Sequence, residues 1–369
     1  MKLLINASGN LYGGGLQVAI SFIYECKKIK SNEYHVFLSP NAQLHVECSN
    51  FPENFQFYQI PQLPFYRRQK YLSELESHVK PEVVFTPFGP TYWRPHVPHI
   101  TGFALGHYIY MDSPYFRIMS IQDKLKLKLK KAIHFYYLKK EADVYIGETT
   151  DVTQRIKKIF GKNKGYFTVS NTCGAQYFNP VSDKDIKRLP PKKEREIRLL
   201  TVCKYYPHKN IEIIKKVIDK LSPEDKSRIS FILTISTEEY QKIFGEKYND
   251  NVTTVGNVSP LKCPSLYREC DIMFLPTLVE CFSASYVEAM VMGKPILTSD
   301  LGFAHSICED AALYFDPLNT NSIIDRIKEI NNSPIMKKQL IEKAKKRSKC
   351  FPTAQQRAEQ YLKICKMSL

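Results

Sequence analysis

The sequence predicts an α/β protein with two doubly wound domains, and three observations lead to this fold class. Short apolar runs alternate with helical patterns along most of the chain, as in parallel sheets covered by helices. The length of 369 residues suits two domains that each bury a core of their own. The stretch 271–300 contains a strand, a loop, a helix and a second strand in close succession.

The unit at 271–300 places a loop where ligands usually bind. An apolar run at 271–275 stops at a proline, which favours a buried strand that ends there. Serines precede the next apolar period, and glycine and proline follow it, so we expect a helix before a further strand at 296–299. The loop 277–284 therefore leads into a helix N-terminus beyond the carboxyl end of a strand, the usual ligand position in open α/β sheets.

Backbone N–H groups at this helix N-terminus favour an anion. They have no partner within the helix, and the positive end of the helix dipole lies behind them. We expect these donors at Phe282, Ser283, Ala284 and Ser285.

Two carboxylates frame the loop, Glu280 before the helix and Glu288 about one turn inside it. Glu288 can accept paired hydrogen bonds from a vicinal diol such as a ribose, and Glu280 can reach hydroxyls of a second sugar unit. A diphosphate between them would lie at the helix N-terminus. Sugar, diphosphate and ribose in this order describe a nucleotide sugar.

Glu280 and Glu288, with seven residues between them, are followed by Ala-Met-x-x-Gly-Lys-Pro. This motif resembles the E-x7-E signature of family 4 (group 1) glycosyltransferases, and much of 299–317 is similar to the same family. The resemblance implies the GT-B fold, two Rossmann-like doubly wound domains facing each other across a cleft, and a retaining reaction. The chain departs from the family at Cys281 and Ser283, where glycine is usual and lets the backbone approach phosphate closely.

The chain begins with a strand at 2–6, a glycine-rich loop and a helical pattern at 16–30. This order brings backbone close to phosphate, but the loop is not the GxGxxG of dinucleotide-binding domains, and a plain turn is the alternative. The resemblance implies that Gly13, Gly14 and Gly15 border the cleft and contact the donor diphosphate or the acceptor.

Further strand-like runs occur at 34–39, 55–60, 83–86, 99–103, 144–147, 166–169, 198–203, 231–235 and 253–255. With the resemblance, they predict an acceptor-side Rossmann-like domain at 1–185 and a nucleotide-sugar-binding one at 186–350. A C-terminal helix at 351–369 is expected to cross back to the first domain.

The segment 87–117 is rich in proline and aromatic residues and has little helical period, which is typical of functional loops. His107 lies within it, and the resemblance implies that it faces the donor sugar; the alternative is a structural histidine. Arg94 and Arg117 are candidates to meet an acceptor phosphate.

Lys204 and Lys209 follow the strand at 198–203 and precede a helical pattern at 211–221. Two cations beside a helix N-terminus suit a diphosphate, although a solvated loop is the alternative. The resemblance implies an arginine and a lysine at these places to hold the donor phosphates. A lysine at position 204 keeps the positive charge but cannot make the paired hydrogen bonds that an arginine makes to phosphate.

Apolar residues recur at every fourth position from 121 to 137, which predicts a helix at 120–140. The helix carries seven lysines and one acid, Asp123. A basic amphipathic helix is typical of membrane-surface binding, and the basic patch at 66–71 could join it. The alternative is a solvated helix that packs through its apolar side.

A net charge of +16 calls for anionic partners, and nucleic acid, anionic membranes and phosphorylated substrates all qualify. The sequence has no helix-turn-helix, zinc finger or RNP motif, so we expect no nucleic acid. The ten cysteines form no CxxC pair and suggest reduced thiols. No apolar run reaches the length of a membrane span, and the N-terminus does not resemble a signal peptide. We therefore expect a cytoplasmic protein, peripheral at the inner face of the membrane.

The residues and the resemblance together predict a retaining hexosyltransferase with a UDP- or GDP-linked sugar donor. The expected acceptor is a glycan or a polyprenyl-diphosphate-linked sugar, in cell-surface polysaccharide biosynthesis of the O-antigen or capsule type. Lys204, Lys209 and the loop amides would stabilise charge on the leaving diphosphate. Glu280 would orient the sugar and His107 would contact it.

No Asp-x-Asp pair stands at a strand end, so we expect a metal-independent enzyme that needs no cofactor. Three alternatives stay open. One is an epimerase or phosphorylase of the same fold, and another is a non-catalytic basic protein that binds nucleic acid or membranes. The third is a scaffold partner with a decayed site, because Cys281 and Ser283 replace the usual glycines.

Overall fold

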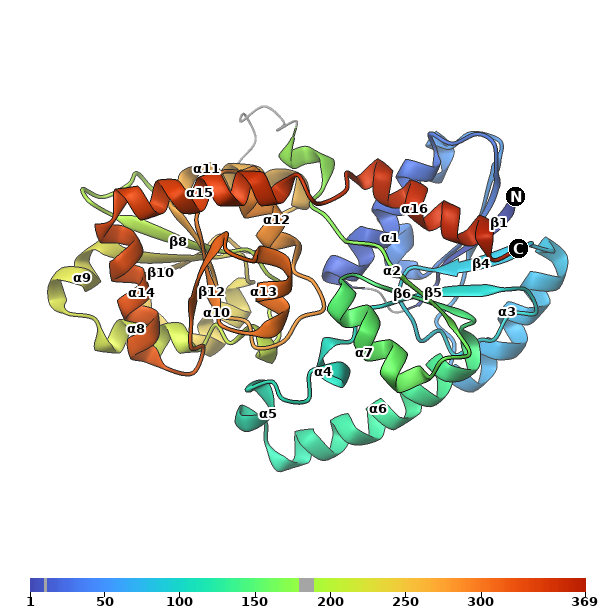
Figure 1. Ribbon diagram of the computed structural model, residues 1–369, viewed down its shortest axis with the longest axis horizontal. Coiled ribbons are helices and arrows are strands. Elements are labelled where there is room, and N and C mark those ends of the chain that lie inside the picture. Colours follow the sequence, from blue (N-terminus) through green and yellow to red (C-terminus); the bar gives the residue numbers. More distant parts are fainter. Residues whose placement is uncertain (10–11, 179–188) are drawn as a thin grey trace. The chain divides into compact units, whose positions relative to one another are not determined.

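The computed structural model describes residues 1–9, 12–178 and 189–369. The chain divides into two compact units (Figure 1). The first unit contains Met1–Met111, Met119–Asn171 and Pro352–Leu369, and the second contains Asp112–Ile118 and Thr172–Phe351. The predicted boundary between 185 and 186 lies outside the described residues.

The first unit is built on seven parallel strands in the order β3-β2-β1-β4-β5-β6-β7. They are β1 (Lys2–Ala7), β2 (Glu33–Leu38), β3 (Phe55–Gln59), β4 (Val83–Thr86), β5 (His99–Phe103), β6 (Val144–Gly147) and β7 (Gly165–Thr168). Nearly every residue of β1, β4 and β5 is buried. Strands covered on both faces have continuous apolar runs, which explains why the sequence predicted them well.

Seven helices in the described residues belong to the first unit. They are α1 (Gly13–Cys26), α2 (Pro40–Gln43), α3 (Phe65–Val79), α4 (Gly106–Ile109), α6 (Ile121–Glu141), α7 (Thr150–Phe160) and α16 (Ala354–Met367). The C-terminal helix α16 lies beside α1 (Figure 1). Its Tyr361 ring packs edge-on against Phe22 at 5.5 Å between centroids, and also contacts Phe85 of β4. The end of the chain thus completes the core of the first unit.

The second unit has six parallel strands in the order β10-β9-β8-β11-β12-β13. They are β8 (Ile197–Thr201), β9 (Ile229–Leu233), β10 (Val252–Thr254), β11 (Ile272–Leu275), β12 (Ile296–Ser299) and β13 (Ala312–Phe315). The sequence-based prediction omitted β13. This strand is short, lies at one edge of the sheet and buries two of its four residues.

Helices cover this second sheet as well. The helices of the second unit are α8 (Ile213–Lys220), α9 (Pro223–Arg228), α10 (Thr237–Ile243), α11 (Cys263–Glu269), α12 (Ala284–Val291), α13 (Gly302–Cys308), α14 (Thr320–Asn332) and α15 (Pro334–Ser348) in the described residues. The single turn α5 (Tyr115–Ile118), from the first half of the chain, also belongs to this unit. The prediction of two Rossmann-like doubly wound domains is confirmed.

Strand order reverses once in each sheet, and these switch points locate the candidate ligand sites. In the first unit the switch lies between β1 and β4, and in the second it lies between β8 and β11. Ligands of open α/β sheets bind outside the carboxyl ends of strands at such a point. The loops that follow β8 and β11 carry Lys204, Lys209 and Glu280, and the helix after the second loop carries Glu288.

The predicted basic helix is confirmed as α6, but its apolar stripe does not pack inside the protein. Ile121, Leu125 and Leu129 are 76%, 63% and 66% exposed. The buried residues of α6, Leu138 and Glu141, lie at its C-terminal end. The alternative of a helix that packs through its apolar side is therefore wrong for the N-terminal turns. Within the described parts of the chain, no helix has the length and apolarity to cross a membrane.

Candidate functional site

The loops after β8 and β11 are joined by hydrogen bonds at the switch point of the second sheet. The first loop contains a 3₁₀ turn, η4 (Pro207–Lys209). The carbonyl of His208 accepts from the backbone N–H of Leu278 at 2.7 Å and from the hydroxyl of Thr277 at 3.2 Å. Because the strands are adjacent and parallel, their following loops meet at one edge and hold each other in place.

Lys209 and Glu280 form an ion pair across these two loops. Their side chains are only 13% and 12% exposed. Oε1 of Glu280 also accepts from the Thr277 hydroxyl at 2.9 Å. Burial favours a lower pKa for Lys209, but the attraction of Glu280 outweighs it and raises the pKa above its usual value. The site therefore holds a permanently charged ammonium beside a carboxylate.

A neutral histidine lies next to this ion pair. Burial lowers the pKa of His208 to about 4, although Glu280 acts in the opposite direction. Its ring stacks on Tyr206 at 5.5 Å between centroids and meets Tyr115 edge-on at 6.0 Å. The hydroxyl of Ser113 donates to the Leu278 carbonyl at 2.6 Å. The segment Asp112–Ile118 thus packs against both site loops.

The helix that follows Glu280 is α12, and Ser283 is its N-cap. The Ser283 side chain makes no capping hydrogen bond, and the first turn contains no acidic residue. First-turn N–H groups have no acceptor within a helix, so this end keeps its preference for an anion. The Ser285 hydroxyl donates to the Val202 carbonyl just beyond β8 at 3.1 Å, which fixes the helix end at the switch point.

The other predicted residues of this region differ in their burial. Phe282 is nearly buried and its ring lies edge-on to Phe351 at 6.0 Å. Ala284 is half-buried, and Lys204 is exposed in the loop after β8. The structure thus brings Lys204, Lys209, Glu280 and the predicted amides of α12 to adjacent loops.

Glu288 lies in the second turn of α12 and is held by two tyrosines. The Tyr267 hydroxyl of α11 donates to Oε2 at 2.9 Å, and the Tyr177 hydroxyl donates to the same carboxylate. The two tyrosine rings are 5.8 Å apart. Burial raises the pKa of Glu288, and both hydroxyls act to lower it.

Sequence reasoning missed Tyr177 and Tyr267 as site residues. Tyr267 is buried at the centre of a short helix, and Tyr177 precedes the segment between the predicted domains. Nothing in their local sequence distinguishes them from core aromatics, and only the fold brings them to Glu288.

The other predicted site residues belong to the first unit. His107 lies in α4, half-buried, with its ring 4.2 Å from that of Tyr108. Gly13, Gly14 and Gly15 form the first turn of α1, and Gly13 has a φ of +54°, a conformation that favours glycine. Their contacts with a donor stay predictions.

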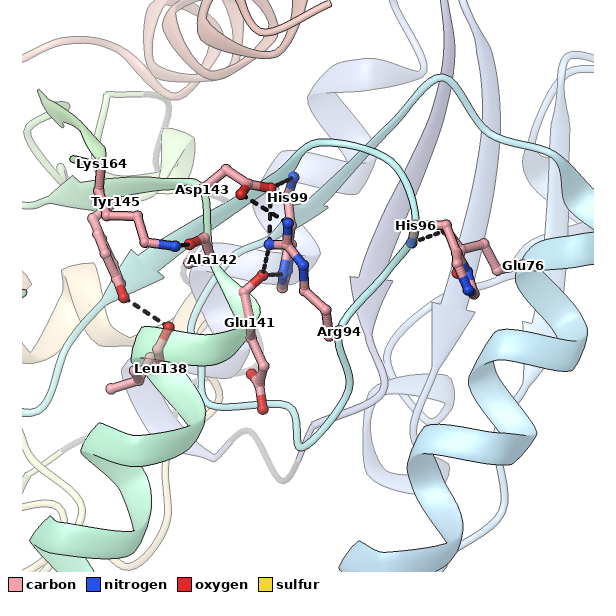
Figure 2. A network of polar contacts seen from close by, with 10 residues as sticks. All are labelled: Glu76, Arg94, His96, His99, Leu138, Glu141, Ala142, Asp143, Tyr145 and Lys164. Carbon is pink, nitrogen blue, oxygen red and sulfur yellow. Dashed lines mark hydrogen bonds and ion pairs between the residues drawn. The ribbon is translucent and has the colours of Figure 1, made fainter.

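Arg94, a candidate to meet an acceptor phosphate, is engaged by a carboxylate of the first unit. Its guanidinium forks onto Asp143, with hydrogen bonds of 2.8 and 2.9 Å to the two carboxylate oxygens (Figure 2). Arg94 also donates to the Glu141 carbonyl. With these donors engaged, Arg94 holds the loop before β5 to the start of β6. Arg117 is exposed in α5 of the second unit.

In 1–9, 12–178 and 189–369, no three His, Cys, Asp or Glu side chains gather as a metal site would require. All ten cysteines are free thiols.

Comparison with known proteins places this site in a family. Residues 182–347 match the family model "Glycosyl transferases group 1". The O-antigen chain mannosyltransferase RfbU of Salmonella typhimurium is 26% identical over 207 residues, which are 55% of this chain and 56% of that protein. The chain spans about half the length of the curated relatives it matches.

Solved structures share the whole fold at low sequence identity. Sucrose-phosphate synthase from Thermosynechococcus elongatus has a TM-score of 0.74 at 15% identity, over 100% of this chain and 99% of that chain. HepE of Anabaena, in complex with UDP-glucose, has a TM-score of 0.74 at 15% identity over 100% of both chains. The fold is GT-B, and the part of the chain that carries Lys209, Glu280 and Glu288 matches the family model of the group 1 glycosyl transferases.

Proposed function

We propose that the protein is a retaining glycosyltransferase of family 4 that uses a UDP- or GDP-linked sugar. The observation that carries this proposal is the Lys209–Glu280 ion pair at the switch point, beside the N-terminus of α12. Glu288 lies further along the same helix, between two tyrosine hydroxyls. The cation and the helix N-terminus can bind a diphosphate, and the two carboxylates can bind the hydroxyls of two sugar rings.

The chemistry follows from charge. Breaking the bond between the sugar and the diphosphate places negative charge on the leaving phosphate. Lys209 keeps its proton because Glu280 raises its pKa, so a fixed positive charge is ready at this place. Such preorganised charge usually contributes most to catalysis. When a phosphate takes hydrogen bonds from Lys209, Glu280 can accept hydrogen bonds from the sugar hydroxyls.

Glu288 and His107 complete the proposal. Glu288 would accept hydrogen bonds from the ribose diol, and the tyrosine hydroxyls favour the ionised form that this needs. His107 would contact the transferred sugar from the first unit. Since Lys209 and the amides of α12 neutralise the diphosphate, the reaction would require no divalent ion.

The relatives support a substrate class. RfbU is named an O-antigen chain mannosyltransferase, and HepE was solved with UDP-glucose. We therefore favour a glycan or polyprenyl-diphosphate-linked acceptor in O-antigen or capsule synthesis, and a nucleotide-diphosphate sugar as the donor.

Such an acceptor suits a cytoplasmic enzyme that is peripheral at the membrane. The exposed stripe of α6 offers apolar side chains between lysines, the pattern of helices that lie in a membrane interface. Each lysine near an anionic leaflet contributes about 1 kcal/mol. We propose that α6 binds the anionic inner face.

A panel of nucleotide sugars tests the donor site by thermal stabilisation. A ligand at a hundred times its Kd adds about 2.7 kcal/mol of stability, so one sugar should raise the Tm clearly. Glu288→Ala and Lys209→Ala should abolish the shift. Lys216→Ala, which removes an exposed lysine of α8, is the matched control. No stabilisation by any UDP- or GDP-linked sugar, or an unchanged shift in both site variants, would refute the proposal.

A further inference from the structure

The first unit contains a buried arginine that has no carboxylate partner among the described residues. Arg68, on α3, is 9% exposed, whereas its neighbour Arg67 is exposed. Its Nη2 donates to the Ser8 hydroxyl at 2.8 Å and to the Ser8 carbonyl at 3.3 Å, and its Nε donates to the Thr91 carbonyl at 3.0 Å. Arg68 is therefore not part of the surface patch that the sequence suggested for 66–71.

The position of Arg68 is that of a ligand-binding group. Ser8 directly follows β1, at the switch point of the first sheet. A Cβ added at Gly9 would meet no heavy atom within 4 Å, so the backbone next to Ser8 borders open space. Within the described residues, Nη1 of Arg68 makes no hydrogen bond. One arm of the guanidinium is thus available beside an open backbone.

The nearest carboxylate that influences Arg68 does not neutralise it directly. Glu141 attracts the guanidinium, but its Oε2 accepts from the backbone N–H of Thr91 at 2.8 Å and from the Thr91 hydroxyl at 3.1 Å. Thr91 thus stands between the two charged groups. A buried cation without a paired anion is costly, and an anionic ligand would remove that cost.

We propose that Arg68, held by Ser8 beside the open backbone at Gly9, binds a phosphate group of the acceptor substrate. This inference rests on the proposed function, because it names the acceptor of the same reaction as a phosphorylated one. Guanidinium groups match phosphate with paired hydrogen bonds, which a lysine does not reproduce. Arg68 joins Arg94 and Arg117, which the sequence suggested, as a candidate for this role.

Pyrophosphate titrated into the full chain by calorimetry tests the site. The wild-type protein should bind pyrophosphate in both units. Arg68→Gln should lower the affinity of the first unit for pyrophosphate about tenfold or more, since charged hydrogen bonds contribute more than neutral ones. The affinity of the second unit should stay unchanged. Lys209→Ala should do the reverse. Arg67→Gln, one residue away and exposed, is the matched control and should change neither site.

A second variant separates binding from folding. Gly9→Ala places a methyl group in the open space without a clash, and should weaken pyrophosphate binding while the unfolding transition stays unchanged. Arg68→Lys should restore only part of the binding. If Arg68→Gln lowers the Tm but keeps the wild-type isotherm, Arg68 only holds the loops together and the proposal is wrong.

The donor also carries phosphate, so its binding is measured in the same variants. Arg68→Gln should leave the Kd of the stabilising nucleotide sugar unchanged. An equal loss of donor binding in Arg68→Gln and Lys209→Ala would overturn the assignment to the acceptor. If the proposed donor site is wrong, the outcome is different. The binding of nucleotide sugars would then not depend on Lys209, while the binding of pyrophosphate would still depend on Arg68.

Discussion

The ammonium of Lys209 donates a hydrogen bond to Oε1 of Glu280, and both side chains are largely removed from solvent. This contact joins two loops that lie far apart in the sequence. It also joins the group proposed to bind phosphate to the group proposed to bind sugar, so each fixes the position of the other before a donor arrives.

We expect the ion pair to be strongly coupled in stability. Lys209→Ala or Glu280→Ala alone leaves the other charge buried and should cost about 3–5 kcal/mol. The double variant should cost less than the sum of the single changes, because no uncompensated charge is left. Urea unfolding of the four proteins measures the coupling. Additive costs would show that the two groups do not act as a buried pair.

The tyrosines on Glu288 should tune donor binding with pH. Their hydroxyls act to lower a pKa that burial has raised. Since the ionised carboxylate accepts from the ribose, donor binding should tighten as pH rises through this pKa. Tyr267→Phe removes one donor and should move the midpoint of the Kd–pH curve to higher pH.

Tyr240→Phe is the matched control, because Tyr240 is also buried and donates to Asn249 and the Val252 carbonyl. It should leave the midpoint where it is. A Tyr267→Phe curve that coincides with the wild-type curve would separate Glu288 from donor recognition.

A buried glutamate should make stability fall as pH rises. Glu141 is almost inaccessible, and burial raises its pKa to about 7 from an ordinary 4.5 (Figure 2). Folding therefore favours the protonated form. The contribution of Glu141 to the free energy of unfolding is complete below pH 4.5 and is lost as pH rises through about 7. This loss lowers the free energy of unfolding by about 3 kcal/mol.

Glu141→Gln should remove this dependence, because the amide does not titrate. Wild-type and variant unfolding free energies should diverge between pH 4.5 and 7. Glu74→Gln, at an exposed position on α3, should follow the wild-type curve. Parallel curves for wild type and Glu141→Gln would show that Glu141 keeps an ordinary pKa. His99 acts oppositely, since burial lowers its pKa to about 4 and its contribution is lost as pH falls.

The sequence predicted the central strands of both sheets because burial on both faces imposes continuous apolar runs. β4, β5 and β6 begin and end where the sequence placed them. The prediction missed β13, a four-residue strand at the edge of its sheet. The Glu280 and Glu288 spacing also carried information, because it places both residues at one end of one helix.

Pairings across the fold were not predictable in the same way. Arg67 and Arg68 are identical residues in one basic patch, yet a helical step of about 100° sends one to solvent and the other to Ser8. Tyr177 and Glu288 meet only because the second sheet brings their segments together. A period of four predicts that α6 has an apolar stripe, but not what covers it.

The exposed stripe of α6 should bind anionic vesicles through charge and apolar area together. Changing Lys124, Lys126, Lys128 and Lys130 to glutamate should release the protein, because each lysine contributes about 1 kcal/mol near an anionic leaflet. Leu125→Ser with Leu129→Ser removes apolar area without a change in net charge, and should also reduce sedimentation with vesicles. The matched control changes four exposed lysines of the second unit, Lys338, Lys345, Lys346 and Lys349. If this control releases the protein equally, net charge alone governs binding and α6 is not the membrane surface.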